Sequence, residues 1–175
     1  ISLSECGFND NCKFFLSRWL DTTKCALLFA KNVLFVEGIA EMLLLPELAK
    51  VYFADLIRQG RLKSELNTLE DFGISIINIG GVYFDYFMQI FGGYTIKKEG
   101  ELTRCASINV RCAGITDNDP PKDTAPIKYA EGDNRLLFMI KQLEQNSKNA
   151  RLFTNLKTFE YDLALETGNI IPLFN

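Results

Sequence analysis

The sequence contains no histidine among its 175 residues. Hydrolysis by a serine–histidine or cysteine–histidine pair is therefore excluded, because neither nucleophile has an imidazole base to activate it. The five cysteines include no CxxC pair, so a zinc cluster has little to build on. We expect these cysteines to be reduced and mostly buried. If the chain catalyses hydrolysis or nucleotidyl transfer, carboxylates and a metal ion must carry most of the chemistry.

Glycine-rich phosphate loops and membrane-length apolar runs are also missing. No G-x-G-x-x-G follows the first predicted strand, and no G-x-x-x-x-G-K-[ST] occurs anywhere, so we expect neither dinucleotide binding nor ATP hydrolysis by this segment. The most apolar stretch, residues 25–46, is interrupted by Lys31, Glu37 and Glu41, and no signal peptide precedes it. We therefore expect a cytoplasmic protein with no membrane partner.

The remaining composition is that of an ordinary globular domain, with 47% hydrophobic and 23% charged residues. The length suits one compact domain, and 14 phenylalanines indicate an aromatic-rich interior. A net charge of −3 excludes a basic nucleic-acid coat protein but allows a locally basic face. Because the chain begins at Ile1 and ends in apolar residues, we expect it to be a domain cut from a longer protein.

Hydrophobic patterning predicts an α/β fold. Short apolar runs alternate with helical segments four times after a helical lead-in, which favours a mainly parallel four-stranded sheet with helices on both faces. We assign residues 1–31 to the lead-in, packed on the domain, and residues 32–175 to the main domain. The predicted strands lie within 32–38, 74–81, 107–119 and 150–158, and the predicted helices span 39–59, 82–93, 133–146 and 159–167.

Charged residues follow three of the four predicted strands. Glu37 ends the first strand, Asp117 and Asp119 end the third, and Lys157 and Glu160 follow the fourth. Ligands of parallel sheets bind beyond the carboxyl ends of the strands. If the strands lie side by side, these four acids and one lysine converge at one edge, where paired carboxylates could hold a hard cation such as Mg²⁺.

Each motif taken alone also has a simpler interpretation. A D-x-D sequence in a loop is more often a turn with self-capping aspartates. Glu41 in a first helical turn complements the helix dipole, and Lys157 with Thr158 could simply begin a helix. Glu37 fits such an interpretation less well, because an acid directly after a buried strand is costly without a partner.

Together the motifs resemble the TOPRIM domain, a Rossmann-like fold shared by topoisomerases, primases and some nucleases. The resemblance rests on VEG after the first strand, GG after the second and D-x-D after the third. Four segments are similar to the C-terminal half of the overcoming lysogenization defect (OLD) family of endonucleases: LLFAKNVLFVEGIAEMLLLPELAK, FGISIINIGGVYFDYFMQIF, ITDND and LKTFEYDLA. Members of that family carry an ABC-type ATPase domain ahead of this region, and none of its motifs is present here.

The resemblance implies a metal-dependent DNA endonuclease that hydrolyses phosphodiester bonds with two divalent cations, Mg²⁺ or Mn²⁺. It makes residues 32–175 the TOPRIM nuclease domain, in which Lys157 steadies the transition state. The implied metal ligands are Glu37, Glu41, Asp117, Asp119 and Glu160, and all of these except Glu41 also count as catalytic.

The implied partners are DNA and the ATPase domain of the same full-length chain, with a homodimer through that domain as an option. Arg111, Lys122 and Lys128 flank the acidic edge and are candidate DNA contacts, although a mixed solvated surface explains each of them equally well. Two alternatives stay open: a topoisomerase- or primase-like enzyme, and a non-catalytic module for DNA binding or assembly. Phage defence, phage exclusion and DNA repair are the biological roles that the resemblance suggests.

Overall fold

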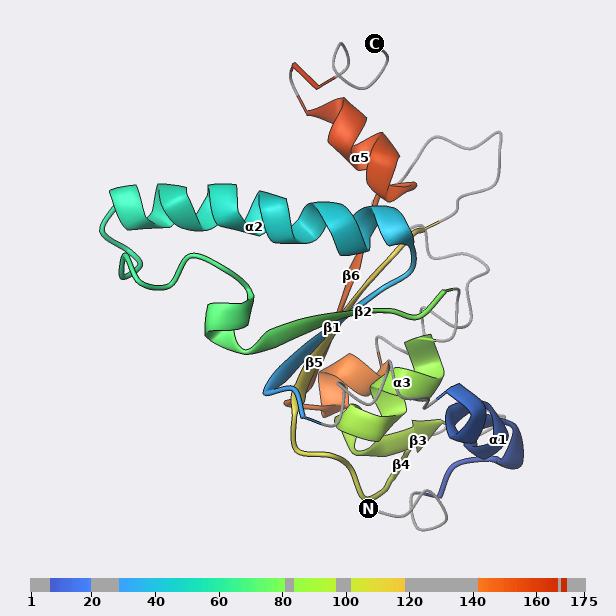
Figure 1. Ribbon diagram of the computed structural model, residues 1–175. Coiled ribbons are helices and arrows are strands. Elements are labelled where there is room, and N and C mark those ends of the chain that lie inside the picture. Colours follow the sequence, from blue (N-terminus) through green and yellow to red (C-terminus); the bar gives the residue numbers. More distant parts are fainter. Residues whose placement is uncertain are drawn as a thin grey trace.

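The structure is a computed structural model of the chain, and it describes residues 7–19, 29–80, 84–96, 102–118, 142–166 and 168–169. Figure 1 shows the described elements along the chain. They are α1 (Asp10–Trp19), β1 (Asn32–Val36), α2 (Ile39–Arg58), η2 (Glu70–Phe72), β2 (Ile74–Asn78), α3 (Phe84–Gly92), β3 (Tyr94–Ile96), β4 (Leu102–Arg104), β5 (Arg111–Thr116), β6 (Ala150–Thr154) and α5 (Phe159–Leu165).

Four strands form one parallel sheet in the order β2-β1-β5-β6. The register pairs Val36 of β1 with Asn78 of β2 and with Ile115 of β5, and it pairs Thr116 of β5 with Thr154 of β6. All four carboxyl ends therefore meet at one edge, and β1 and β5 are the central strands. The predicted α/β fold with a parallel four-stranded sheet is confirmed.

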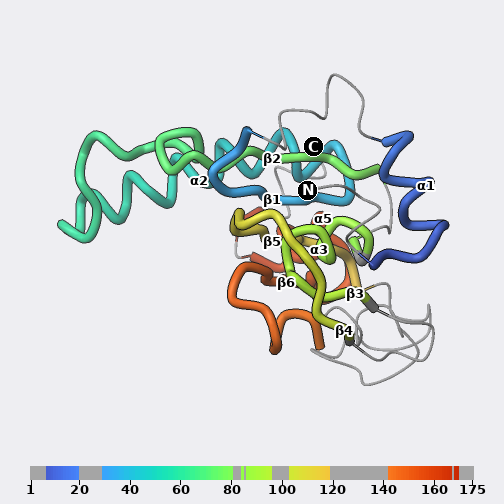
Figure 2. The backbone as a smooth tube through the Cα atoms, turned by 90° about the horizontal axis from the view of Figure 1, so that it is seen from below, coloured from blue at the N-terminus to red at the C-terminus, as the bar shows by residue number. Residues whose placement is uncertain are grey.

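Helices lie on both faces of this sheet. The chain crosses from β1 to β2 in one direction and from β2 to β5 in the other, so right-handed connections place α2 and α3 on opposite faces. α3 packs on the face of β5 that carries Cys112, whose Sγ lies 3.7 Å from Sδ of Met88. α2 packs against β1 and β2 and extends well past them (Figure 2). Its 20 residues span about 30 Å.

The core lies between the sheet, α3 and α1. Phe87 of α3 is fully buried, and its ring centroid lies 4.3 Å from that of Trp19 in α1 and 5.3 Å from that of Phe35 in β1. The sheet approaches α3 closely at Gly114, where an added Cβ would lie 2.8 Å from the Phe84 ring. The described part of the N-terminal lead-in thus shares the core of the sheet. We keep the division at residue 31 as a proposal.

Local details differ from the pattern-based predictions. An antiparallel pair of three-residue strands, β3 and β4, follows α3 and was not predicted. In agreement with the predicted helix over 39–59, α2 continues through Pro46. Of the predicted helix at 133–146, the structure describes residues 142–146, which are helical. None of the described helices is long and apolar enough to span a lipid bilayer.

Candidate metal site at the carboxyl edge of the sheet

The side chain of Glu37 reaches across the end of the neighbouring strand. Glu37 follows β1 directly, and because Val36 pairs with Ile115, it stands beside the end of β5. Its Oε2 accepts hydrogen bonds from Oγ1 of Thr116 at 2.8 Å and from the backbone N–H of Asp117 at 3.1 Å. Glu37 therefore has the partner that its position after a buried strand requires, and the interaction fixes its orientation.

The carboxylate of Asp117 is held from the other side of the site. Its Oδ1 accepts hydrogen bonds from Nδ2 of Asn155 at 2.8 Å and from the backbone N–H of Phe159 at 3.1 Å. Asn155 follows β6, and Phe159 is the first residue of α5. A continuous set of hydrogen bonds thus runs from Glu37 on β1, through Asp117 on β5, to the turn between β6 and α5.

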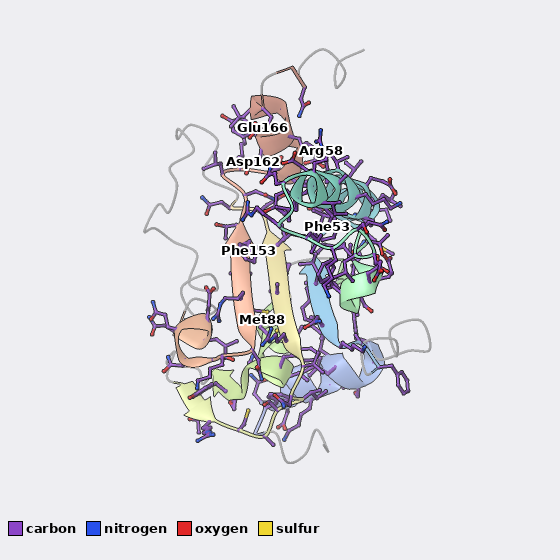
Figure 3. All side chains as sticks on the ribbon, turned by 90° about the vertical axis from the view of Figure 1, so that its left-hand side faces the viewer. Phe53, Arg58, Met88, Phe153, Asp162 and Glu166 are labelled. Atoms are coloured by element: carbon purple, nitrogen blue, oxygen red, sulfur yellow. The ribbon has the colours of Figure 1, made fainter. Side chains whose placement is uncertain are left out.

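The β6–α5 turn is itself stabilised by local polar contacts. The backbone N–H of Leu156 donates to both carboxylate oxygens of Asp162, at 3.2 and 3.0 Å. Thr158 is the N-cap of α5, and its Oγ1 accepts a hydrogen bond from the backbone N–H of Tyr161. Figure 3 shows Asp162 beyond the strand ends, beside the start of α5.

This turn brings Lys157 to the same edge as the two acids. The backbone N–H of Asn118 donates to the carbonyl oxygen of Lys157 at 3.1 Å, so the chain segments after β5 and β6 lie side by side. The Lys157 side chain is exposed, with Nζ 5.9 Å from the centre of the Tyr161 ring. Glu160 is exposed in the first turn of α5, one residue beyond the backbone N–H that binds Asp117.

Glu41 is a buried carboxylate in the first turn of α2, only 5% exposed. Its Oε2 lies over Gly38, where an added Cβ would come within 2.9 Å of it. Among the described residues no group donates a hydrogen bond to this carboxylate. The helix dipole favours an acid at this position, as the sequence suggested. No fully buried side-chain oxygen of the described residues lacks a hydrogen-bond partner, so this carboxylate is not an unpaired buried charge.

The predicted site residues are only partly brought together. Within the described ranges, no three acidic or cysteine side chains come close enough to one another to hold an ion jointly. Glu37 and Asp117 are direct neighbours, whereas Glu41 and Glu160 stand on helices that begin at the same edge. Asp119, Lys122 and Lys128 lie outside the residues that the structure describes.

Arg111, expected to flank the acidic edge, lies at the opposite edge. It is the first residue of the six-residue strand β5, whereas Asp117 follows the last, so about 20 Å separates the two residues. The error has a simple cause: both residues belong to one conspicuous sequence segment, but an extended strand carries its two ends far apart. Contact of Arg111 with DNA stays a prediction.

Two residues of the site were missed by the sequence analysis, Thr116 and Asn155. Each lies at or just beyond the end of a strand, and each donates a side-chain hydrogen bond to one of the predicted acids. Their positions as polar residues at strand ends could have identified both as site residues from the sequence. Which acid it meets depends on the strand register, which the sequence alone does not give.

The family comparison agrees with this geometry. The family model described as "Overcoming lysogenization defect protein-like, TOPRIM domain" matches residues 28–119, just over half of the chain. The matched segment includes β1, β2 and β5 and therefore both Glu37 and Asp117. Searches of the curated proteins and of the solved structures gave no match. The chain therefore belongs to the OLD-like family and contains its TOPRIM domain.

Proposed function

We propose that this chain is the endonuclease domain of an OLD-type protein and that it hydrolyses DNA phosphodiester bonds with the help of two divalent cations. Membership of the family supports a nuclease or related DNA-processing domain in general. The observation that carries the finer proposal is the arrangement of Glu37 and Asp117. Hydrogen bonds orient both acids at the edge where parallel sheets bind their ligands. A cytoplasmic location and coupling to an ATPase domain belong to the same proposal.

The carboxylate side chains at this edge are of the chemical type that binds Mg²⁺ or Mn²⁺. Carboxylate oxygens are the ligands that these ions prefer, and the acids at this edge of the sheet supply them. Glu37, Glu41 and Asp117 would hold the ions, with Asp119 and Glu160 as the remaining proposed ligands. Such ions, when bound, lower the pKa of a coordinated water and stabilise a leaving oxygen.

The chain's own side chains hold the site in shape before any ligand arrives. Thr116 orients Glu37, and Asn155 together with the Phe159 backbone orients Asp117. Groups fixed in this way need no reorganisation during the reaction, which is the main source of electrostatic catalysis. The exposed Lys157 supplies a positive charge beside these acids for a DNA phosphate.

Replacement of Asp117 tests the proposal directly. We expect Asp117→Ala to lower Mn²⁺-dependent cleavage by at least about 100-fold, because the removal of groups that merely support metal ligands already costs 10–100-fold. Cleavage is measured on supercoiled and on linear DNA, and folding is followed by thermal unfolding. Glu65→Ala, an exposed acid in the loop after α2, is the matched control and should cleave at the wild-type rate.

Full activity of Asp117→Ala would contradict the assignment of the site. The two DNA forms also separate the alternatives, because a topoisomerase relaxes supercoiled DNA without releasing cut products. A non-catalytic module binds both forms and changes neither. The same variants in the full-length protein test the proposed coupling to an ATPase domain.

A further inference from the structure

Apart from the candidate metal site, the sheet has an exposed surface over β5 and β6, on the face that carries α2. Side chains alternate along β6, so Arg151 and Phe153 point to the same face, next to Ala113 and Ile115 of β5. Figure 3 views the sheet from this side, with β5 and β6 toward the reader and α2 beside them. Phe153 is 58% exposed. The half of this face over β5 and β6 therefore presents an aromatic ring to solvent.

A cavity of about 520 Å³ adjoins Phe153, at the amino ends of the strands. Its volume lies within the roughly 300–1,000 Å³ range of ligand-binding clefts. Leu34, Ala113 and Phe153 contribute apolar lining, and Asn32 and Asn149 contribute amides. The charged residues of the lining are all cations, namely Arg111, Lys148 and Arg151.

The three cations of this cavity differ in how they are held. Nη1 of Arg151 donates to the carbonyl oxygens of Ser147 at 3.1 Å and Ala150 at 2.6 Å, and its Nε lies 3.9 Å from Glu144. Arg111 and Lys148 are exposed, and neither forms an ion pair with any described residue. In a chain of net charge −3, the cavity thus carries two cations, Arg111 and Lys148, without an ion-pair partner among the described residues. Its chemical complement is a polyanion.

We propose that this cavity and the adjoining Phe153 surface bind a single-stranded segment of DNA. Phosphates would lie against Arg111, Lys148 and Arg151, and an unstacked base would lie on the Phe153 ring. A cationic groove combined with an exposed aromatic ring is the usual composition of single-strand binding surfaces. A duplex would leave the ring unused, because its bases are already stacked on one another.

The position of the cavity relates it to the candidate metal site. Arg111 and Asp117 lie at opposite ends of β5, about 20 Å apart, and Phe153 lies between the two edges on the adjacent strand. One DNA strand could therefore contact both places. The inference thus rests on the proposed function for its purpose, but DNA binding at the cavity is measurable without any metal ion.

The test is fluorescence anisotropy with a labelled oligothymidylate of about 20 nucleotides, longer than the roughly 4–16 nucleotides that such surfaces occupy. EDTA is present throughout, so that a metal at the acidic edge contributes nothing. We expect Arg111→Gln, Lys148→Gln and Phe153→Ala each to weaken binding about fivefold or more. The slope of log affinity against log salt should fall by about 0.7 for each cation removed.

Matched controls exist on another part of the surface. Tyr52 on α2 is an aromatic residue that is 59% exposed, compared with 58% for Phe153, so Tyr52→Ala removes a similar ring elsewhere. Lys63, exposed in the loop after α2, serves as the cation control in Lys63→Gln. Both control variants should bind the oligonucleotide like the wild type. Thermal unfolding of each variant shows whether a loss of binding reflects a loss of folding.

The outcomes separate this inference from the proposed function. If the cavity variants bind like the wild type while Mn²⁺-dependent cleavage persists, the inference is wrong and the nuclease proposal stands. If they lose binding although the wild type never cleaves DNA, the cavity binds DNA and the nuclease proposal fails. The inference is overturned if the wild-type protein binds no oligonucleotide. It is also overturned if the protein binds duplex DNA equally well and Phe153→Ala has no effect. The inference is also overturned if the protein forms a dimer that Phe153→Ala dissociates without changing the affinity for the oligonucleotide, because this face is then a protein interface.

Discussion

At the scale of single residues, the candidate site depends on hydrogen bonds that turn each acid in a defined direction. Glu37 and Asp117 receive two donors each, from side chains and from backbone N–H groups. Hydrogen bonds to charged acceptors are worth about 1.5–3 kcal/mol each, so these orientations are strongly preferred. The supporting residues should therefore influence metal affinity without touching the metal.

Thr116 gives the cleanest test of this idea. Thr116→Val removes the hydroxyl donor to Glu37 with little change of shape, so we expect Mn²⁺ affinity to fall about 10–100-fold. Thr116→Ser restores the hydroxyl and should recover most of the affinity. Binding is measured by electron paramagnetic resonance of Mn²⁺, without DNA. Equal affinity of all three proteins would mean that the Thr116 hydroxyl does not position a ligand.

The thiol of Cys112 should be unreactive toward alkylating reagents in the folded protein. Burial raises the pKa of its thiol from 9.0 to about 12, so little thiolate exists near pH 8. Because the folded-state pKa is the higher one, this group favours folding fully below pH 9 and progressively less between pH 9 and 12. Peptide mapping after alkylation at pH 8 should show Cys112 unlabelled in the native protein and labelled after unfolding. Rapid native labelling of Cys112 contradicts its burial.

At the scale of elements, sequence patterns predicted those strands whose apolar runs are long enough to be distinctive. β1 and β2 coincide with short runs rich in valine and isoleucine that end in an acid or glycines. β3 and β4 have three residues each, too few for any periodicity. The acids themselves were predictable from their places after strands. Thr116 and Asn155 were not, because their roles follow from the strand register.

The β6–α5 turn provides a prediction at this scale. Thr158→Ala removes the N-cap of α5 and should lower the free energy of unfolding by about 0.5–2 kcal/mol, measured by urea denaturation. Because the same turn places Lys157 and the N–H that binds Asp117, DNA cleavage should fall as well. Thr158→Ser is the control and should keep both properties. Unchanged unfolding of Thr158→Ala would show that the cap contributes nothing to the turn.

At the scale of the whole molecule, the parallel sheet joins parts of the chain that are distant in sequence. The hydrogen bond between Thr116 and Glu37 spans 79 positions, and the one between Asn155 and Asp117 spans 38. Contacts of such long range form slowly, since the entropy of closing the intervening loops must be overcome first. We therefore expect the site to form late in folding.

This late assembly has a consequence for the cell in which the protein is made. A nascent chain on the ribosome carries Glu37 and Asp117 before Asn155 and α5 have been synthesised, so it lacks the groups that orient Asp117 in the folded protein. If the domain cuts DNA, cleavage should not occur until β6 and α5 have been synthesised. The order of the elements along the chain therefore leaves the candidate site incomplete until β6 and α5 have been synthesised.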